Sequence, residues 1–569
     1  MIKLRDAIHS RISSVLAAIG AEGARHTLEF PADLSHGDLA SNAALVAAKQ
    51  VGMNPRQLAE ECASQLRKEN DPNIASISVA GPGFINISLS DAALWQSVYA
   101  AAGDPKWGMT ERFLGKKVIV EYTDPNPFKE FHIGHLMPNA IGEALARLIT
   151  AGGAEVRRVN YQGDVGMHVA MALWGVMHHH EEMPREEASH RDHAAFLGKA
   201  YAKGAAAFQN DPAAKEAITR INRQIYDRSD PLIRALYDTG RRWSLEYFED
   251  IYKLLGTRFD HYFFESETSG PGKSVVEAHP EIFERSDGAI VFPGEKYGLH
   301  TRVFINQDGL PTYEAKELGL AKMKYDLFPY NLSIIVTASE VTEYFKVLLK
   351  AMELVYQKEQ LAEKTQHIAH GVMRLAGGKL SSRTGNVRTA LSLIDDAKEE
   401  ILSRIDTSRG FSEVERQEIA EKAAVGAIKF AILRQEIGRD ILFDYATSLS
   451  FEGDSGPYLQ YTLARLSSLL QKAGGALRDS GGATMEKPEE LERLIARYPA
   501  IVLRAQEEFA PHHITQYLLA LSRTFNAYYA KTQIIGVPES GYRIRLAQSV
   551  SRTLAHGLDL LAIPRMERM

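Results

Sequence analysis

The chain has 569 residues, of which 45% are hydrophobic and 24% are charged, and its formal net charge is −6. This length exceeds what one hydrophobic core supports, so we expect three or four domains. The net negative charge argues against nonspecific coating of nucleic acid, and no stretch approaches the roughly 18 uncharged apolar residues of a membrane span. The single cysteine, Cys62, excludes an internal disulfide and a thiolate-rich zinc site. We therefore expect a cytoplasmic protein without a membrane segment.

The first hundred residues predict a small α+β module. An Ala-rich stretch from Leu39 to Lys49 predicts a helix. Asn54 followed by Pro55 predicts the start of the next helix, with Asn as N-cap and Pro at the first helical position. Apolar and polar residues alternate over 77–80 and 84–89 around a Gly-Pro-Gly turn, which predicts two strands with one buried face.

A different pattern begins at Lys117. Residues 118–122 predict a strand, a proline-containing loop follows, and a helix runs to Ile149 before a second strand at 156–161. This order implies a parallel sheet with its ligand at the carboxyl ends of the strands. Polar helical sequence over about 170–255 predicts an insertion.

The remaining patterns complete three predicted domains. Strand signals return at 289–292, 302–305 and 334–336, and the chain from about Leu391 onward is almost wholly helical. We therefore predict an α/β doubly wound (Rossmann-like) domain with a helical insertion, flanked by a small α+β N-terminal domain and an all-α C-terminal domain. The predicted boundaries are 1–110, 111–400 and 401–569.

Two histidines, His132 and His135, lie one turn apart at the start of the predicted helix. A helix N-terminus favours anions, and imidazole N–H donors suit the charge that develops on a pentacoordinate α-phosphate. Gly134 lacks a Cβ, which lets a flat adenine ring lie against the backbone. The alternative interpretation is a histidine pair that only caps the helix.

The loop before these histidines carries further polar residues. It presents Asn126 and Lys129 beside the helix start, and Glu121 lies at the preceding strand end. Two prolines stiffen the loop, and a lysine here can reach a phosphate as a mobile point charge. A turn-forming Asn and a solvated Lys are the alternatives.

A second cationic loop follows two glycines at 377–378. Its hydroxyl and cationic side chains are the donors that a triphosphate requires, although alone it reads as an ordinary surface loop. The candidate residues are Lys379, Ser381, Ser382 and Arg383.

Two more groups of residues are candidate ligand-binding sites. Tyr313 and Glu317 are four residues apart and face the same side of a helix, where a phenol and a carboxylate can grip a guanidinium or ammonium. The alternative is a solvent-facing pair. The run from His178 to Glu182 contains residue types that bind metals. Adjacent histidines on a helix point in different directions, however, so we predict a solvated helix face there.

These motifs, taken in order, resemble class I aminoacyl-tRNA synthetases. The HIGH signature stands at 132–135 and a KMSKS-like loop at 379–383. More narrowly, the chain resembles the arginyl-tRNA synthetase family over essentially its full length. The matching segments are 81–86, 125–136, 160–166, 309–313 with Glu317, 456–461 with 464–465, and 566–569.

The resemblance implies activation of L-arginine with ATP and Mg²⁺, and transfer of arginine to the 3′ end of tRNA(Arg). It implies a monomer, activation that depends on bound tRNA, and no metal held by the protein. The residues that it assigns to catalysis are His132, His135, Lys129, Lys379 and Arg383. Lys129 compensates for the second lysine of the KMSKS-like loop, whose place is taken by Ser382. It assigns ATP binding to Gly134, His132, His135, Lys379, Ser381 and Ser382. It assigns arginine binding to Glu121, Asn126, Tyr313 and Glu317. It assigns tRNA binding to Phe84, Asn86, Tyr461, Arg465 and Met569.

The chain departs from the family pattern at four positions. Glu317 stands where the family has Asp, Val165 where it has Trp, His168 where Gln is common, and Asp124 where Ser is usual. Two alternative functions therefore stay open. One is a tRNA-binding protein that has lost catalysis, and the other is a different adenylyl-transferring enzyme of the HIGH type.

Overall fold

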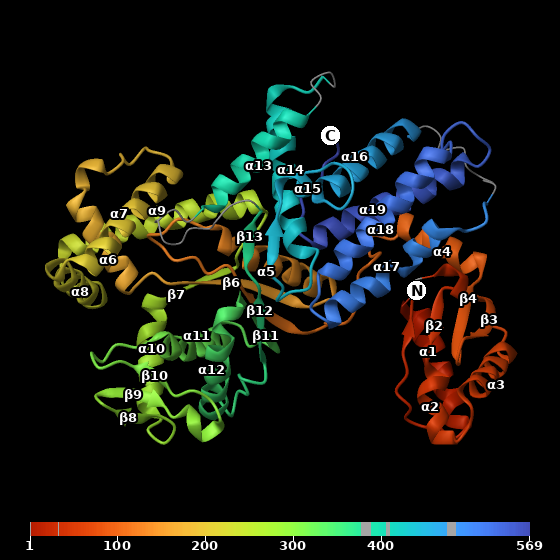
Figure 1. Ribbon diagram of the computed structural model, residues 1–569, viewed down its shortest axis with the longest axis horizontal. Helices are drawn as coiled ribbons and strands as arrows, with labels where there is room; N and C mark the ends of the chain where they lie inside the picture. The colour runs from red at the N-terminus through yellow and green to blue at the C-terminus, as the bar shows by residue number, and fades with distance from the viewer. Residues whose placement is uncertain (1, 32, 377–387, 406–409, 475–484, 569) are drawn as a thin grey trace.

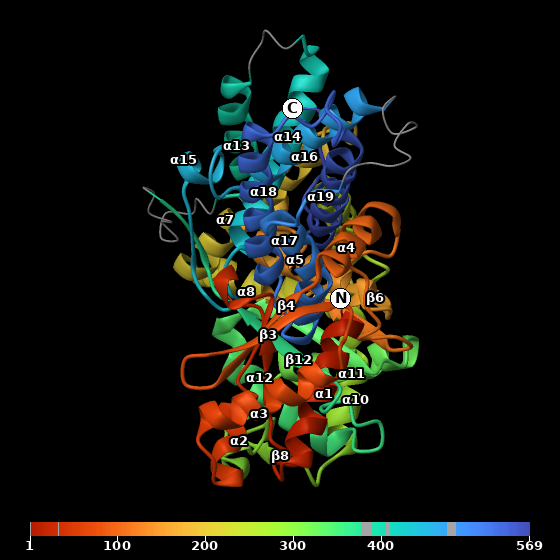
Figure 2. The ribbon, with the colours of Figure 1, turned by 90° about the vertical axis from the view of Figure 1, so that its right-hand side faces the viewer.

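The computed structural model describes residues 2–31, 33–376, 388–405, 410–474 and 485–568. Within these ranges the chain forms a small N-terminal module, a central domain built on a parallel sheet, and a helical C-terminal part (Figure 1). Figure 2 shows the same parts after a 90° turn, again with the N-terminal module adjoining the C-terminal helices. Among the described helices, none combines the length and apolar character needed to cross a membrane.

The N-terminal module packs three helices on a four-stranded antiparallel sheet. The strand order is β1 (Leu28–Glu29), β2 (Leu39–Ser41), β4 (Phe84–Leu89) and β3 (Ile74–Ala80), and the helices are α1 (Ile2–Ala18), α2 (Ala43–Val51) and α3 (Pro55–Lys68). The side chain of Asn54 caps α3, and Pro55 occupies its first turn, as predicted. Cys62 on α3 is completely buried, and burial raises the pKa of its thiol to about 11.

The predicted helix from Leu39 to Lys49 was wrong for its first residues. Leu39, Ala40 and Ser41 form strand β2, which pairs with β4, and helix α2 begins only at Ala43. Pairing with β4 leaves Leu39 with no exposed surface. Burial in the sheet therefore outweighs the helix propensity of the Ala-rich sequence.

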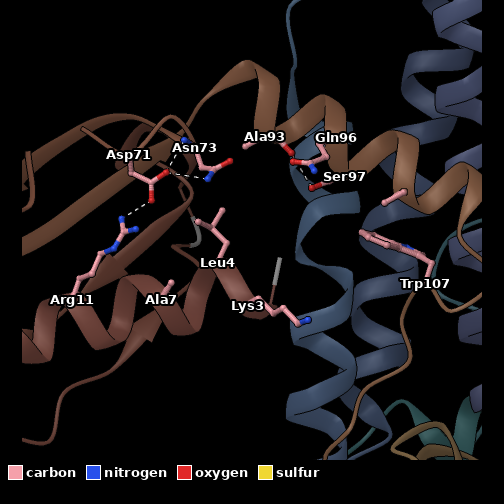
Figure 3. Close-up of a pocket in the computed structure, with 11 residues that line it drawn as sticks. Lys3, Leu4, Ala7, Arg11, Asp71, Asn73, Ala93, Gln96, Ser97 and Trp107 are labelled. Atoms are coloured by element: carbon pink, nitrogen blue, oxygen red, sulfur yellow. Dashed lines mark hydrogen bonds and ion pairs between the residues drawn. The ribbon is translucent and has the colours of Figure 1, made fainter. Parts of the chain in front are cut away.

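Helix α4 (Asp91–Gly103) joins the module to the rest of the chain. A groove of about 440 Å³ lies between α1, the start of β3 and α4 (Figure 3). On the module side Arg11 donates to Asp71 at 2.5 Å. Beyond α4, Trp107 donates its Nε1–H to Thr553 Oγ1 of the C-terminal part at 3.1 Å. Residues 104–116 therefore form a linker that is anchored to the C-terminal helices.

The central domain contains five parallel strands. Their order is β12 (Thr365–His370), β11 (Leu332–Ala338), β5 (Lys117–Glu121), β6 (Glu155–Gln162) and β7 (His261–Phe264), and the helices around them are α5 (Ile133–Ala151), α10 (Glu265–Ala278), α11 (Tyr313–Leu327) and α12 (Thr342–Val355). Val118 and Val120 of β5 enter the core that contains α5, whereas Ile119 enters the core that contains α11. Because β6 and β11 lie on opposite sides of β5, the strand order reverses there and a crevice forms at its carboxyl end.

The predicted strands after the insertion are confirmed. A small antiparallel sheet precedes α11 and contains β10 (Arg302–Ile305), β9 (Ala289–Phe292) and β8 (Glu284–Ser286). The third predicted strand, 334–336, lies inside β11.

The insertion between β6 and β7 is helical, as predicted. It contains α6 (Met167–His178), α7 (His190–Asn210), α8 (Pro212–Asp227) and α9 (Pro231–Leu255). Buried Asp164 holds it to the central domain, accepting hydrogen bonds from Tyr237 Oη (2.9 Å), Arg241 Nε (3.0 Å) and the N–H of Ser266 (2.9 Å). The insertion is therefore fixed to the start of α10 at the crevice.

The C-terminal part is almost wholly helical. Its helices are α13 (Ala390–Arg404), α14 (Glu413–Leu433), α15 (Tyr445–Ser448), α16 (Gly456–Ala473), α17 (Glu490–Glu507), α18 (His512–Lys531) and α19 (Ser540–Leu560). The one departure from the prediction within the described residues is β14 (Ile441–Phe443), which pairs in parallel with β13 (Met373–Leu375).

A buried polar cluster, the interdomain joint, connects α5 to the C-terminal helices. Glu143 on α5 accepts hydrogen bonds from Tyr122 Oη (2.6 Å), Arg147 Nε (2.7 Å) and Arg158 Nε (3.1 Å). Arg147 also donates to the carbonyl of Asp559 at 3.0 Å. Lys429 on α14 donates to the carbonyls of Leu255 and Ala562, and burial lowers the pKa of this lysine to about 7.

Candidate active site

The loop between β5 and α5 is held in an uncommon backbone conformation. Thr123, Asp124 and Phe128 have φ angles of +83°, +45° and +67°, although none is glycine. The buried Phe128 donates its N–H to Ser244 Oγ on α9 at 2.9 Å. Such strain persists only where the surrounding structure imposes it, and it is often found at functional sites. The insertion therefore fixes the loop at the crevice.

His132 and His135 lie together at the N-terminus of α5. His132 is the N-cap, and the two ring centroids are 3.7 Å apart. Nδ1 of His132 accepts the N–H of Gly134 at 3.1 Å, and Nδ1 of His135 accepts the N–H of His132 at 3.2 Å. Burial and nearby positive charge lower the pKa of both histidines, so both rings are neutral near pH 7. Since both Nδ1 atoms accept, each proton lies on Nε2, and capping leaves two Nε2–H donors for a ligand.

A cavity of about 340 Å³ adjoins this histidine pair, and we call it the nucleotide cavity. Gly134, both histidines and the ends of β11 and β12 line it. A Cβ on Gly134 would lie 2.9 Å from the His132 ring, so the residue must stay small. Lys129 Nζ lies 4.5 Å from the centroid of the Tyr201 ring on α7. The other predicted nucleotide-binding residues, Lys379, Ser381, Ser382 and Arg383, lie outside the described residues.

A second cavity, of about 540 Å³, lies at the ends of β5, β6 and β11, and we call it the acidic cavity. Six carboxylates line it: Glu121, Asp124, Glu265, Glu314, Glu317 and Glu340. Asn126 and Tyr313 line the same cavity. The structure thus brings together all four residues predicted to hold arginine, while their individual roles stay a prediction.

Three of the six carboxylates are already paired with a cation. The pairs are Lys324 with Glu121 (2.8 Å), Lys316 with Glu265 (2.7 Å) and Arg302 with Glu314 (3.4 Å). Across the described part of the chain, no ion pair involves Glu317 or Asp124. Burial and the charge of Glu121 raise the pKa of both groups, that of Glu317 to about 8. The cavity therefore offers unpaired carboxyl groups to a cationic ligand.

Sequence reasoning missed the lysines and Glu265, although each carries a signal. Lys324 follows Glu317 by seven residues, which is two helical turns and therefore the same face of α11. Glu265 directly follows β7, and parallel strands carry their functional residues at the carboxyl end. The partnership of Lys324 with Glu121 joins residues 203 positions apart and has no local signature.

Two of the departures from the family pattern are accommodated by packing. His168 donates its Nε2–H to the carbonyl of Gly163 at 2.8 Å, and burial lowers its pKa to about 4, so the ring is neutral. Val165 is buried in the core formed by Phe128 and Val169. Val165 therefore packs with the loop before α5, and His168 holds the residue that follows β6.

Four of the predicted tRNA-binding residues lie outside the central domain, namely Phe84 and Asn86 on β4 and Tyr461 and Arg465 on α16. Phe84 begins β4 and is 40% exposed, whereas Asn86 is buried within the sheet. On α16, Arg465 donates to Asn526 Oδ1 at 2.6 Å and its guanidinium lies 4.8 Å from the centroid of the Tyr461 ring. Met569 lies outside the described residues.

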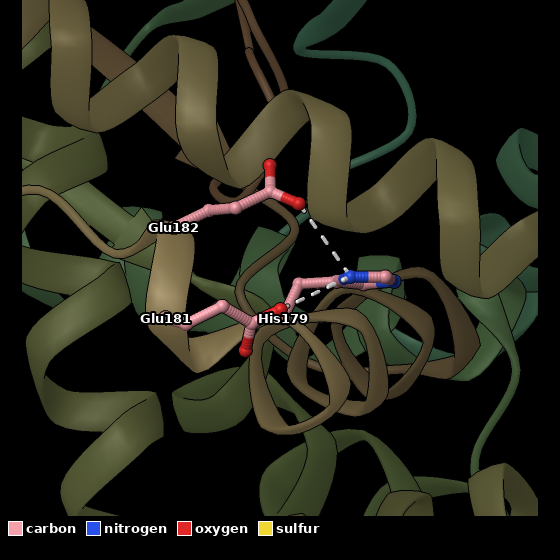
Figure 4. A group of neighbouring side chains, drawn as sticks. All are labelled: His179, Glu181 and Glu182. Carbon is pink, nitrogen blue, oxygen red and sulfur yellow. Dashed lines mark ion pairs between the residues drawn. The ribbon is translucent and has the colours of Figure 1, made fainter.

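The histidine-rich run after α6 places three potential metal ligands close together. The ligand atoms of His179, Glu181 and Glu182 lie within 4.8 Å of one another (Figure 4). Glu182 also accepts a hydrogen bond from Lys203 at 2.7 Å, and the carboxylates of Glu181 and Glu182 are exposed. This arrangement is that of a solvated helix end, and the absence of a bound metal here stays a prediction.

Comparison with solved structures identifies the architecture. Methionyl-tRNA synthetase of Mycobacterium tuberculosis shares the fold with a TM-score of 0.51 at 14% identity, over 78% of this chain and 91% of that one. Arginyl-tRNA synthetase of Thermus thermophilus matches with a TM-score of 0.84 at 26% identity, over 100% of both chains. With the histidine pair at the switch point of the sheet, these matches define a class I aminoacyl-tRNA synthetase.

Family profiles and relatives narrow the assignment. The profile "tRNA synthetases class I (R), catalytic domain" matches residues 106–445, "DALR anticodon binding domain" matches 459–569, and "Arginyl tRNA synthetase N terminal domain" matches 3–89. The chain belongs to the arginyl-tRNA synthetase family. Arginine–tRNA ligase of Treponema pallidum is 31% identical over 96% of this chain and 95% of its own length, and that of Streptococcus pneumoniae is 29% identical over 99% and 100%.

Proposed function

We propose that the chain is an arginine–tRNA ligase that activates L-arginine with ATP and transfers it to the 3′ end of tRNA(Arg). The observation that carries the proposal is the pair of free Nε2–H donors on His132 and His135, beside a cavity with unpaired carboxyl groups. Neutral imidazoles can donate to charge that develops on a phosphate, and carboxylates bind a guanidinium through charge-assisted hydrogen bonds.

In the activation step, the α-carboxylate of arginine attacks the α-phosphorus of ATP in line. A carboxylate–phosphorus bond forms while the bond to pyrophosphate breaks, so no protein nucleophile is needed. The two histidines and Lys129 stabilise the charge on the α-phosphate oxygens, and the loop before α5 fixes their positions. Mg²⁺ is supplied with the nucleotide. The sequence assigns four residues to the β- and γ-phosphates of ATP: Lys379, Ser381, Ser382 and Arg383.

In the transfer step, a hydroxyl of the 3′-terminal adenosine attacks the carbonyl carbon of the adenylate and AMP leaves. Residues 1–110 bind the tRNA elbow, 111–400 perform catalysis, and 401–569 bind the anticodon end. The arginine side chain is held by Glu121, Asn126, Tyr313 and Glu317, and the tRNA by Phe84, Asn86, Tyr461, Arg465 and Met569. The protein acts as a cytoplasmic monomer.

The proposal is tested by ATP–pyrophosphate exchange with arginine, measured with and without total tRNA. Lysine and glutamine serve as control substrates. Of the three amino acids, we expect only arginine to support exchange, and only when tRNA is present. A chain that binds tRNA but supports exchange with none of these amino acids is instead the non-catalytic tRNA-binding protein.

A histidine substitution tests the catalytic assignment. His135→Ala removes one Nε2–H donor and should lower the exchange rate by about 100-fold or more, because such donors act on transition-state charge. Its affinity for tRNA should not change. His178→Ala, at the exposed end of α6, is the matched control and should retain the wild-type rate. Equal rates for the two variants would exclude the histidine pair from catalysis.

A further inference from the structure

The side chain of Lys129 is held by an aromatic ring rather than by an oxygen. Among the residues that the structure describes, its Nζ makes no hydrogen bond and no ion pair. The ammonium instead lies over the ring of Tyr201 on α7, 4.5 Å from the ring centroid. The hydroxyl of Tyr201 has no hydrogen-bond partner within the same described ranges. The ring of Tyr201 is therefore what fixes the position of this cation.

The ammonium of Lys129 lies beside the histidine pair. Burial, and then the charge of Lys129, lowers the pKa of His132. The same charge contributes to the lowered pKa of His135, after burial and the neighbouring His132. Both histidines line the nucleotide cavity. A cation whose field acts on both rings is therefore close enough to act on an anion bound between them.

The helical insertion fixes both the backbone and the side chain at this point. Phe128, which directly precedes Lys129, has a left-handed backbone and donates its N–H to Ser244 Oγ on α9 at 2.9 Å. On the same helix, a Cβ on Gly240 would lie 2.3 Å from the ring of Phe128. Helix α7, which carries Tyr201, packs against α9. Two packed helices of the insertion therefore hold the loop and its cation together.

We propose that Tyr201 is a positioning residue, which holds the ammonium of Lys129 at the α-phosphate of the bound nucleotide. The face of an aromatic ring attracts a cation, and an ammonium has three N–H donors, so donors remain for the phosphate oxygens. A free lysine side chain samples many rotamers, and holding it in place beforehand lowers the entropy lost in the transition state. The assignment rests on the proposed function, in which Lys129 acts on this phosphate.

Two substitutions at position 201 separate the ring from the hydroxyl. ATP–pyrophosphate exchange is measured with arginine and total tRNA on the full chain. Tyr201→Phe keeps the ring face, and its rate should stay within about twofold of the wild type. Tyr201→Leu removes the ring and should lower kcat by about 3- to 30-fold, the range that corresponds to exposed and desolvated cation–π contacts. The KM for ATP should change much less, because the contact serves the transition state.

A double-mutant cycle shows whether Tyr201 acts through Lys129. In the Lys129→Met background, Tyr201→Leu should have no further effect on the rate, whereas a purely structural role would slow both backgrounds equally. The matched control is Phe208→Leu on the same helix. The ring of Phe208 lies 5.6 Å from Nζ of Lys215, a cation that the site does not use. This variant should retain the wild-type rate.

Each outcome supports or overturns the assignment. Exchange by Tyr201→Leu that is as fast as the wild type, or faster, overturns it, because the ring then only competes with the phosphate for the lysine. An equal loss in both backgrounds, or an equal loss in Tyr201→Phe and Tyr201→Leu, also overturns it. A wild-type chain that supports no exchange with arginine shows a different failure. The proposed function is then wrong, and the assignment of Tyr201 is rejected with it.

Discussion

The free carboxyl groups of the acidic cavity couple substrate binding to protonation. The pKa of Glu317 is raised to about 8, first by burial and then by the charge of Glu121, while Lys324 opposes the shift. A bound guanidinium favours the ionised carboxylate and lowers that pKa. Arginine binding at pH 7 should therefore release protons, and affinity should fall as the pH drops below about 8. Calorimetric titrations in buffers with different ionisation enthalpies measure this release.

A control variant isolates the source of the protons. Glu317→Gln cannot ionise and should release fewer protons, and its affinity should depend less on pH. A wild-type binding heat that is the same in every buffer at pH 7 would contradict the protonated state of the cavity.

The sequence predicts the types of residue in the site better than their state. His132, His135, Glu121 and Glu317 are found by motif and spacing, and the structure places them at one crevice. Their protonation could not be predicted, because it depends on burial and on neighbours distant in sequence.

At the scale of elements, α5 approaches Tyr122, the residue that follows β5, too closely for a side chain at the point of contact. A Cβ on Gly142 would lie 2.2 Å from the ring of Tyr122, which is completely buried. Gly142→Ala must therefore displace Tyr122, directly before the loop that carries Asp124. We expect a loss of stability of about 1–3 kcal/mol from overpacking, together with slower exchange. Thermal unfolding and the exchange assay measure the two effects.

Gly103→Ala provides the matched control. Gly103 is the last residue of α4, and a Cβ there would meet no atom within 4 Å. Alanine should leave the stability unchanged or raise it by a few tenths of a kcal/mol, up to about 1 kcal/mol, through its higher helix propensity. If both variants unfold at the wild-type temperature, the close approach of α5 to Tyr122 does not limit stability.

Hydrophobic patterning predicts most elements of the central domain, because β5 and α5 are apolar and buried along nearly their whole length. It fails at β2, where three residues join a sheet through Leu39 and read locally as helix. Short strands of this kind are specified by their partner strand, and single-sequence patterns do not contain that information.

At the scale of the whole molecule, the interdomain joint contains a lysine that is costly to charge. Burial lowers the pKa of Lys429 from 10.5 to about 7. Between these values the unfolded chain holds a proton that the folded chain does not, so this lysine makes stability rise with pH from about 7 to 10. Lys429→Met should remove that rise. Unfolding temperatures of the wild type and variant at pH 7, 8 and 9 measure it.

Lys422→Met on the same helix is the control, because the Lys422 side chain is partly exposed and its ion-pair partner among the described residues is Glu418. Its unfolding temperature should follow the wild-type pH dependence. A constant difference between wild type and Lys429→Met across this range would show that Lys429 does not lose its proton in the folded chain.

The sequence predicts three domains, but it does not predict how they pack against one another. Lys429 contacts carbonyls 174 and 133 positions away in the sequence, at Leu255 and Ala562. Such contacts depend on how complete domains dock, and no local pattern encodes them.

The buried thiol of Cys62 makes this chain convenient for fluorescence studies. Maleimide dyes react with thiolates, and a thiol that is enclosed and has a pKa of about 11 supplies almost none at neutral pH. Cysteines introduced on the outer surfaces of α3 and α7 could therefore be labelled without first removing the native one. Energy transfer between the two dyes would then report, in single molecules, how the N-terminal module moves relative to the insertion when tRNA arrives.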